Sequence, residues 1–485
     1  MVLESIDYKK IFYYFEKISS IPRGSRNNQA ISDYLVSFAK ERGLYYIQDA
    51  YLNVIIIKEA AEGYEDCPAV ILQGHMDMVC EKNQDTEHDF TQEGLELILD
   101  GDMIRANGTT LGGDDGIAVA YALSILDDET LALPRIEVII TTDEEIGMDG
   151  AAGLDCSVLK GRYMLNLDQE EEGTLLTSCA GGMTSVCHIP LSCGRENGMR
   201  YKITISGLKG GHSGIEIDKN RTNADLLLGR LLSELHLRQC CFSVIEMHGG
   251  LKDNAIPREA FAEVVVAEQD TDKFSVIIGE LEQQYKKELM SSEPELSITG
   301  KYMDQGSYEV LDKESFDKVV FMLLFTPNGI QKMSSDVKGL VESSLNLGIF
   351  HITEGRACFS YSVRSSKDSY KIYLGNKLKC LAAHLGGDYQ VSGDYPSWEY
   401  RRESRLREIC IRVFREQYSY DARIEAIHAG LECGIIAGKI KDLDIISIGP
   451  DIFDIHTPLE RMSVSSVIRV YQFVIKVIEE LCEKV

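Results

Sequence analysis

The chain is short of basic residues: 50 lysines and arginines stand against 77 aspartates and glutamates, for a formal net charge of −27. An acidic excess of this size repels nucleic acid and anionic membranes. It suits basic partners or divalent cations better, although an acidic balance is often no more than a solvated surface. We therefore expect no nucleic-acid partner.

Targeting and membrane signals are also missing. The N-terminus has no basic region followed by an apolar stretch and a small-residue cleavage site, so we expect no signal peptide. No uninterrupted apolar run reaches the length needed to cross a bilayer. We therefore expect no membrane partner and a cytoplasmic location.

No Cys-x-x-Cys pair occurs among the 13 cysteines, which are scattered through apolar contexts such as Val186-Cys187-His188. This pattern argues against a disulfide framework and against a thiolate zinc site, and it predicts reduced cysteines buried as small hydrophobic residues. What is present is an ordinary globular composition, with 44% hydrophobic and 26% charged residues in 485. A chain of this length predicts two domains.

Strands alternate with helices in the first part of the chain, which predicts an α/β domain with a mostly parallel sheet and helices on both faces. The expected strands are 53–58, 69–73, 138–142 and 163–168, and the expected helices are 8–18, 28–42 and 117–126. Beyond residue 183 the pattern changes to hairpin-like strand pairs between helices, such as strands 201–206 and 296–303, and its second half repeats the first. We predict one domain of residues 1–183 and 394–485, and an inserted α+β domain of residues 184–393 with two related halves.

Histidines and acids gather where the strands of the first domain end. The carboxyl ends of parallel strands meet at one edge of a sheet. Histidine with carboxylates, and without thiolates, suits zinc, cobalt or manganese. Five such residues are too many for one catalytic zinc with an open position, but they suit two metals that share a carboxylate about 3.5–4 Å apart. The candidates are His75, Asp114, Glu144 or Glu145, Asp168 and His456.

Each candidate also has a purely structural interpretation. His75 fits a hydrogen-bonded core histidine. Asp114 and Asp115 fit the N-terminal cap of the following Ala-rich helix, and the acids after Asp168 fit a solvated loop. These interpretations leave unexplained why every such residue falls where a parallel sheet would bring its strand ends together.

A set of motifs runs along the chain. These are Gly74-His75-Met76-Asp77, Gly113-Asp114-Asp115-Gly116, Asp143-Glu144-Glu145, Asn166-Leu167-Asp168, Gly210-Gly211-His212-Ser213-Gly214, Asn254-Ala255-Ile256-Pro257, His428-Ala429-Gly430-Leu431-Glu432 and His456-Thr457-Pro458-Leu459-Glu460-Arg461. Together they resemble the aminoacyl-histidine dipeptidase branch of the dinuclear zinc carboxypeptidase and aminopeptidase superfamily. The similarity covers essentially the whole chain in order.

The resemblance implies a dinuclear metal centre in the first domain, with the inserted domain as a lid. His75, Asp114 and Asp168 would hold one metal, and Asp114, Glu145 and His456 the other. Asp77 would orient the imidazole of His75. Glu144 would be the general base that takes a proton from the attacking water and gives it to the leaving amine. Asp115 departs from the asparagine often found in this branch, and we expect it to cap the helix.

In the lid, the resemblance implies that His212 stabilises the oxyanion that develops in the transition state. In many relatives this histidine comes from a partner subunit, but a doubled lid allows the contact in cis, so homodimer and monomer both stay open. Asn254 and Arg364 are candidate clamps on the substrate carboxylate, although Arg364 equally fits a surface arginine at a strand end. Glu432 is a candidate for holding the free amine of the substrate.

The sequence therefore predicts hydrolysis of unblocked dipeptides, Xaa-His or a broader range, by a water activated between two zinc ions, with cobalt or manganese as other possible metals. A broader aminopeptidase, tripeptidase or N-acyl amino acid amidase on the same scaffold is the alternative. A non-catalytic binding protein is a remote one, because such a descendant is expected to lose a ligand or the base, and none is missing.

Overall fold

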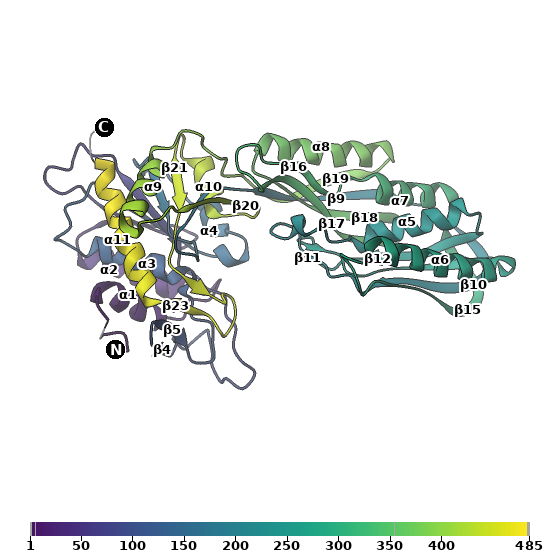
Figure 1. Ribbon diagram of the computed structural model, residues 1–485, viewed down its shortest axis with the longest axis horizontal. Coiled ribbons are helices and arrows are strands. Elements are labelled where there is room, and N and C mark those ends of the chain that lie inside the picture. The colour runs from purple at the N-terminus through teal and green to yellow at the C-terminus, as the bar shows by residue number, and fades with distance from the viewer. Residues whose placement is uncertain (1, 5, 354, 483–485) are drawn as a thin grey trace. The chain divides into compact units, whose positions relative to one another are not determined.

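The computed structural model describes residues 2–4, 6–353 and 355–482 and divides into two compact units (Figure 1). The first unit comprises Met1–Ser178, Tyr400–Ala426 and Leu431–Val485, and the second comprises Cys179–Glu399 and Ile427–Gly430. The chain thus leaves the first unit and later returns to it. The assignment of residues 1–183 and 394–485 as a catalytic domain, and of residues 184–393 as its lid, stays a prediction.

An eight-stranded sheet forms the centre of the first unit. Its four inner strands, β6, β3, β7 and β21, run parallel, whereas β1–β2, β2–β6 and β21–β8 pair antiparallel. The expected mostly parallel sheet is therefore a mixed sheet that is parallel at its centre. In sheet order the strands are β1 (Tyr45–Gln48), β2 (Val54–Lys58), β6 (Ile136–Thr141), β3 (Val70–His75), β7 (Tyr163–Asn166), β21 (Asp444–Ser447), β8 (Thr174–Cys179) and β20 (Arg423–Ile427).

Helix α3 (Gly113–Leu126) is buried along its whole length. Its Ala-rich sequence allows close packing against helix α1 (Lys9–Ser19) and strand β3. The same core includes apolar residues of the other long helices of this unit. These are α2 (Gln29–Glu41), α9 (Arg405–Tyr418) and α11 (Val464–Cys482); the short helices are η1 (Glu144–Ile146), α4 (Asp149–Gly153) and α10 (Glu432–Lys439).

A separate four-stranded sheet in the first unit holds the segment that contains His456. Strands β22 (Ile452–Phe453) and β23 (Arg461–Ser463) form a hairpin, and β23 pairs with β5 (Met103–Ala106), which pairs with β4 (Leu97–Asp100). The hairpin loop therefore presents residues 454–460 from a fixed base.

The second unit is built on a nine-stranded sheet whose strands pair antiparallel throughout the described residues. The strand order is β15 (Ser297–Leu311), β10 (Cys193–Ser206), β14 (Ala260–Val266), β12 (Phe242–Gly249), β17 (Val341–Thr353), β18 (Arg356–Ser365), β9 (Gly181–Pro190) and β19 (Asp388–Tyr395), with β16 (Gly329–Met333) on β17. The long helices are α5 (Ala224–Leu237), α6 (Thr271–Leu289), α7 (Lys313–Phe325) and α8 (Asp368–His384), and the short elements are β11 (Gly211–His212), η2 (Ile217–Lys219), β13 (Ala255–Ile256) and η3 (Glu268–Asp270).

Two runs of elements in this sheet have the same connectivity. One run is β10-α5-β12-β14-α6-β15 and the other is β9-α7-β17-β18-α8-β19, and the strands of each occupy the sheet in the order 4-1-3-2. The first run lies in sequence between β9 and α7 of the second. The two runs join where β12 pairs with β17.

All 13 cysteines are free, but the expectation that they are buried is wrong for four of them. Cys80, Cys193, Cys241 and Cys380 are exposed. Apolar neighbours in sequence do not ensure burial, because adjacent residues of a strand point to opposite faces and adjacent residues of a helix such as α8, which contains Cys380, point to different sides. Among the described residues, none of the helices combines the length and apolar character that a membrane span requires.

The acids after Asp168 do not form a simple solvated loop. The side chain of Glu172 is 7% exposed. It accepts hydrogen bonds from Arg469 Nε at 2.8 Å and from Tyr418 Oη at 2.6 Å. Burial alone would raise the pKa of Glu172, but the hydrogen bonds from Arg469 and Tyr418 outweigh it and hold the pKa below its usual value.

Replacing Glu172 with Gln is expected to lower the free energy of unfolding at pH 7 by about 1–2 kcal/mol. The folded-state pKa is depressed, so the ionised carboxylate stabilises the fold above its unfolded pKa of about 4.3, and this contribution is lost as pH falls through the folded value. Urea unfolding from pH 7 to pH 3 should therefore show the wild-type advantage shrinking toward acid. An advantage that grows toward acid would contradict this assignment. Exposed Glu62→Gln is the matched control.

Candidate metal centre

Three parallel strands of the first unit bring the candidate residues to one edge. His75 is the last residue of β3, Glu144 and Glu145 form the 3₁₀ turn after β6, and Asp168 follows β7. Because β6, β3 and β7 are parallel neighbours, their carboxyl ends lie together. Asp114 joins them from the start of α3, which packs on β3.

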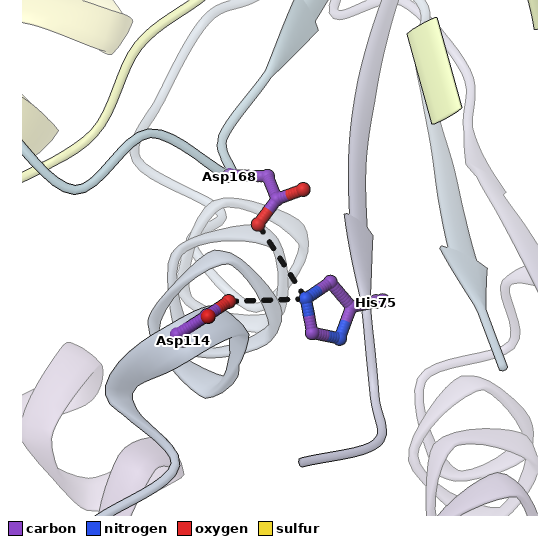
Figure 2. A group of neighbouring side chains, drawn as sticks. All are labelled: His75, Asp114 and Asp168. Carbon is purple, nitrogen blue, oxygen red and sulfur yellow. Dashed lines mark hydrogen bonds and ion pairs between the residues drawn. The ribbon is translucent and has the colours of Figure 1, made fainter. Parts of the chain in front are cut away.

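His75, Asp114 and Asp168 form the first group of converging side chains (Figure 2). His75 Nε2 lies 3.1 Å from Asp114 Oδ1 and 3.4 Å from Asp168 Oδ1. The three side chains are at most 9% exposed. Figure 2 shows both carboxylates directed at the same ring nitrogen.

Asp114, Glu145 and His456 form the second group, so Asp114 belongs to both. His456 Nε2 lies 3.1 Å from Asp114 Oδ2 and 3.1 Å from a carboxylate oxygen of Glu145. Asp114 thus directs one oxygen at each histidine. The structure brings together all five ligands that the sequence predicts.

The distances and donor types of the two groups fit a pair of divalent ions. Two ligand atoms on a tetrahedral zinc ion lie about 3.3 Å apart, close to the spacings of 3.1–3.4 Å here. Burial is the largest cause that raises the pKa of Asp168 to about 6, and the charges of Asp114 and Glu145 add to it against the opposing effect of His75. Crowded carboxylates of this kind are relieved by a bound cation.

Asp77 contacts both His75 and the acidic turn. Its Oδ1 lies 3.5 Å from His75 Nδ1 and accepts a hydrogen bond from the backbone N–H of Glu144 at 3.2 Å, while its Oδ2 accepts from Ser25 Oγ at 2.8 Å. A proton held on Nδ1 by Asp77 leaves Nε2 free to bind a metal. Burial raises the pKa of Glu144 well above its usual value, which suits a group that must accept a proton near neutral pH.

Asp143 holds the acidic turn to the N-terminal segment. Its Oδ1 accepts hydrogen bonds from Arg26 N at 2.6 Å and from Asn28 Nδ2 at 2.7 Å. Asp143 and His456 have φ angles of 55° and 60°, in a region that residues other than glycine seldom adopt. Both of the loops that contribute to the second ligand group therefore contain a residue in a left-handed conformation.

The expectation that Asp115 caps helix α3 is wrong. The N-terminal cap is Gly112, with no side-chain capping bond. Asp115 Oδ2 instead accepts a hydrogen bond from the backbone N–H of His75 at 3.2 Å. A Cβ on Gly74 would lie 2.4 Å from this oxygen, so glycine is needed there. Asp115 therefore binds the strand that carries His75, because its non-helical backbone directs the carboxyl toward β3.

Residues 71–480 match the description "Peptidase family M20/M25/M40". The chain belongs to this peptidase family. It is 36% identical over 484 residues to the "Cytosol non-specific dipeptidase" of Escherichia coli K12, with 99% of each chain covered. A solved structure of aminoacylhistidine dipeptidase from Vibrio alginolyticus superposes with a TM-score of 0.92 and 34% identity, covering 100% of this chain and 99% of that one. Aminopeptidase PepT from Bacillus cereus, at 15% identity and a TM-score of 0.54, shares the fold.

Two charged residues that the sequence interpretation missed support the metal centre of this M20-family chain. Glu460, which is 2% exposed, accepts backbone hydrogen bonds from Leu111 at 2.7 Å, Gly112 at 3.0 Å and Gly113 at 2.8 Å, and more weakly from Asp114 at 3.4 Å.

Arg23 is the second of these residues, and it is 2% exposed. Its guanidinium donates to the carbonyls of Met76, Asp77 and Gly112, so it ties the two loops together. Glu460 lies four residues after His456 in the same motif, and its place in this motif is the sequence signal that could have identified it. The break at Pro22-Arg23-Gly24 gave no comparable signal for Arg23.

Replacing Glu460 with Gln is expected to weaken metal binding by about 10–100-fold. The amide has one acceptor oxygen, whereas the carboxylate accepts hydrogen bonds on both oxygens from the backbone of the loop before Asp114. Competition against a calibrated chelator measures the change. Unchanged affinity would show that the loop holds its shape without this carboxylate. Exposed Glu65→Gln is the matched control.

The second unit contains His212, Asn254 and Arg364. His212 Nδ1 accepts the backbone N–H groups of Gly214 and Ile215, both at 3.2 Å. Burial, and then the positive charge of Arg364, lowers the pKa of His212. The ring is therefore neutral with its proton on Nε2, which makes that nitrogen a hydrogen-bond donor.

Arg364 has unused donor capacity next to His212. Its Nη1 donates to Tyr395 Oη at 3.1 Å, while its buried Nε has no partner in the described chain. His428 hydrogen-bonds with Ser344 at 2.7 Å, and burial followed by the charge of Arg364 lowers the pKa of His428 to about 3, so it stays neutral. Among His212, Arg364 and His428, the positively charged side chain is therefore Arg364.

Asn254 lies in the same part of the second unit. Its carbonyl accepts a hydrogen bond from Ser213 N at 2.9 Å, next to His212 in sequence, and its side chain is exposed. The structure thus joins the Asn254 segment to the His212 segment through the backbone.

Glu432 is fully buried in the first unit. Its Oε2 accepts from Gln73 Nε2 and Thr141 Oγ1, both at 2.6 Å, while Oε1 has no partner in the described chain. Burial raises the pKa of Glu432 to about 8. The carboxyl is thus anchored to β3 and β6 just before the strand ends that carry the metal ligands.

Proposed function

We propose that this chain is a metal-dependent dipeptidase that hydrolyses unblocked dipeptides in the cytosol. The observation that carries the proposal is the pair of three-residue groups that share Asp114, with Glu144 adjacent to Glu145. A shared carboxylate between two histidine-containing groups is the arrangement of two-metal hydrolases. The printed names of both full-length relatives, a non-specific dipeptidase and an aminoacylhistidine dipeptidase, support this reaction.

We assign the two groups to two divalent ions, zinc in the first place and cobalt or manganese as other candidates. Histidine nitrogens with carboxylate oxygens are the ligands that these metals share. When bound, the ions would polarise the scissile carbonyl and make water more acidic. The first set is His75, Asp114 and Asp168, and the second is Asp114, Glu145 and His456.

Glu144 is the proposed general base. Its raised pKa lets the carboxylate take a proton from the attacking water and deliver it to the leaving amine. Asp77 holds His75 in the tautomer that presents Nε2 and also fixes the backbone of Glu144. Asp77 thereby positions both a ligand and the base, since its main-chain carbonyl also lies 3.2 Å from His75 Nδ1.

The second unit is proposed to supply substrate contacts as the lid. His212 presents an Nε2–H donor for the oxyanion. Arg364 and Asn254 are proposed to bind the substrate carboxylate, supported by the unpartnered Nε of Arg364. Glu432 is proposed to bind the free amine. The repeated strand order of the lid suits a monomer, in which His212 acts in cis, as well as a homodimer.

A panel of peptides tests the proposal and defines the substrate range. Purified protein loaded with zinc, cobalt or manganese is assayed on Xaa-His and other dipeptides, tripeptides and N-acetylated dipeptides. We expect hydrolysis of unblocked dipeptides and at least about tenfold lower kcat/KM for the longer and blocked compounds. Preference for tripeptides or N-acyl compounds would move the chain to the alternative activities on this scaffold. Absence of any turnover with metal bound would overturn the proposal.

A further inference from the structure

A row of imidazole and thiol side chains crosses the sheet of the second unit. The strand register places His248 opposite His351, His351 opposite Cys358, and Cys358 opposite His188. Residues directly opposite one another on neighbouring strands point to the same face of a sheet. Four side chains of metal-binding types therefore stand side by side on β12, β17, β18 and β9.

This row lies on the face of the sheet that the helices leave uncovered. The sequence neighbours Phe350, Phe359 and Cys187 point the other way, into the core formed with α5, α6, α7 and α8. Because successive residues of a strand alternate between faces, His351, Cys358 and His188 lie opposite that core. His188, His248 and His351 are partly exposed, and Cys358 is 9% exposed.

The spacing of the row matches the reach of a single ion. Directly opposed Cβ atoms are about 5 Å apart, and zinc binds histidine nitrogen at about 2.0–2.1 Å and cysteine sulfur at about 2.3 Å. An ion above Cys358 is within reach of the longer side chains of His351 on one side and His188 on the other. An ion above His351 would lie beyond the reach of the short Cys358 side chain, so His248, whose ring is stacked on Phe261, stays outside the site. The ligand atoms of His351, Cys358 and His188 are not already gathered as those of the dinuclear centre are, so binding requires rotation of the side chains.

The electrostatic surroundings leave His351 available, whereas burial raises the pKa of the Cys358 thiol, so a metal has to displace its proton. Burial, followed by the charges of His248 and His188, lowers the pKa of His351, so its ring is neutral at pH 7. Nδ1 of His188 is buried and has no hydrogen-bond partner in the described chain. The positive charge of Arg356 also acts on His351, whereas Asp388 lies opposite His188 in register and adds a negative charge to the row.

We propose that His351, Cys358 and His188 form a binding site for a divalent d-block cation, zinc in the first place. Imidazole with thiolate is a ligand set that zinc and cobalt both accept. Binding releases the thiol proton of Cys358 to solvent.

Cobalt titration separates this site from the dinuclear centre, whose candidate ligands contain no sulfur. Thiolate bound to Co²⁺ gives a charge-transfer band in the near ultraviolet, which histidine and carboxylate ligands do not give. The full-length protein is titrated with Co²⁺ alone while absorbance and bound metal are measured. Cys358→Ser, His351→Gln and His188→Gln are compared with Cys380→Ser and His384→Gln, which lie on α8 away from the row.

We expect binding of a third equivalent of Co²⁺ together with the charge-transfer band. Cys358→Ser should abolish the band. Each histidine variant should raise the Co²⁺ concentration at which the band is half-maximal by about tenfold or more. The two control variants should leave it unchanged, and circular dichroism and dipeptidase activity should show that all variants are folded. Saturation at two equivalents without the band would overturn the proposal, as would a band that persists in Cys358→Ser or is unaffected by both histidine variants.

Discussion

Glu144→Gln is expected to lower kcat/KM by about 10²–10⁴-fold while the purified protein keeps its bound metal. Gln has the shape of Glu but cannot take a proton from water, so the chemical step is lost without the removal of a proposed ligand. Steady-state kinetics on a hydrolysed dipeptide and elemental analysis of the same sample measure the two quantities. The hydrogen bond between Glu144 and Asp77 comes from the backbone N–H of Glu144, so the substitution retains it.

Glu145→Gln is the matched control for this substitution, because it changes the same functional group one residue later. It should lose metal together with activity, since Glu145 lies 3.1 Å from His456 Nε2 in the second group. Substantial turnover by Glu144→Gln would refute its role as the base. Loss of metal from Glu144→Gln, with metal retained by Glu145→Gln, would require the two roles to be exchanged.

Asp114→Asn is expected to have the largest effect on metal binding, because Asp114 contributes an oxygen to each ligand group. We expect the affinity at both groups to fall by at least about 100-fold. A ligand present at 100 times its Kd stabilises a protein by about 2.7 kcal/mol. Thermal unfolding with and without added zinc should therefore show a rise in Tm for the wild type and almost none for Asp114→Asn.

Asp168→Asn separates the shared ligand from an unshared one. Asp168 belongs to the first group alone, so this variant should keep about one equivalent of metal, bound through Asp114, Glu145 and His456. Equal losses from Asp114→Asn and Asp168→Asn would show that the ions bind only as a pair. Two equivalents retained in Asp114→Asn would remove Asp114 from the ligand set.

The elements of the fold could be predicted wherever burial leaves a pattern in the sequence. Strand β6 is buried at every residue and α3 is almost wholly apolar beyond its first turn, so both are recognisable as core elements. Strands β10 and β15 extend beyond the expected 201–206 and 296–303, to Cys193–Ser206 and Ser297–Leu311. The added residues are mostly exposed polar residues that pair with each other, and a strand without a buried face shows no alternation.

The ligands of the candidate site could be predicted because each has a metal-binding side chain at a strand end, at the start of a helix or in a loop beside the sheet. Glu460 and Arg23 could not, because both act on backbone atoms more than 50 residues away in sequence. The orientation of Asp115 was also beyond a sequence pattern, since a carboxylate in the first turn of a helix fits a cap and a tertiary contact equally well. Side-chain chemistry is visible in a sequence, whereas contacts to a distant main chain are not.

The place at which the first run of the lid sheet interrupts the second has a consequence for how this chain can be shortened. Asp312 N donates to Ser192 O at 3.0 Å, and Cys193 pairs with Leu311, so the segment between them enters and leaves at a single point. Residues 193–311 are therefore an excisable module. A chain that joins residue 192 to residue 312 keeps the complete second run and uncovers the part of β17 that pairs with β12, while β16 stays paired with the rest of that edge. A free edge of this kind invites pairing with another copy.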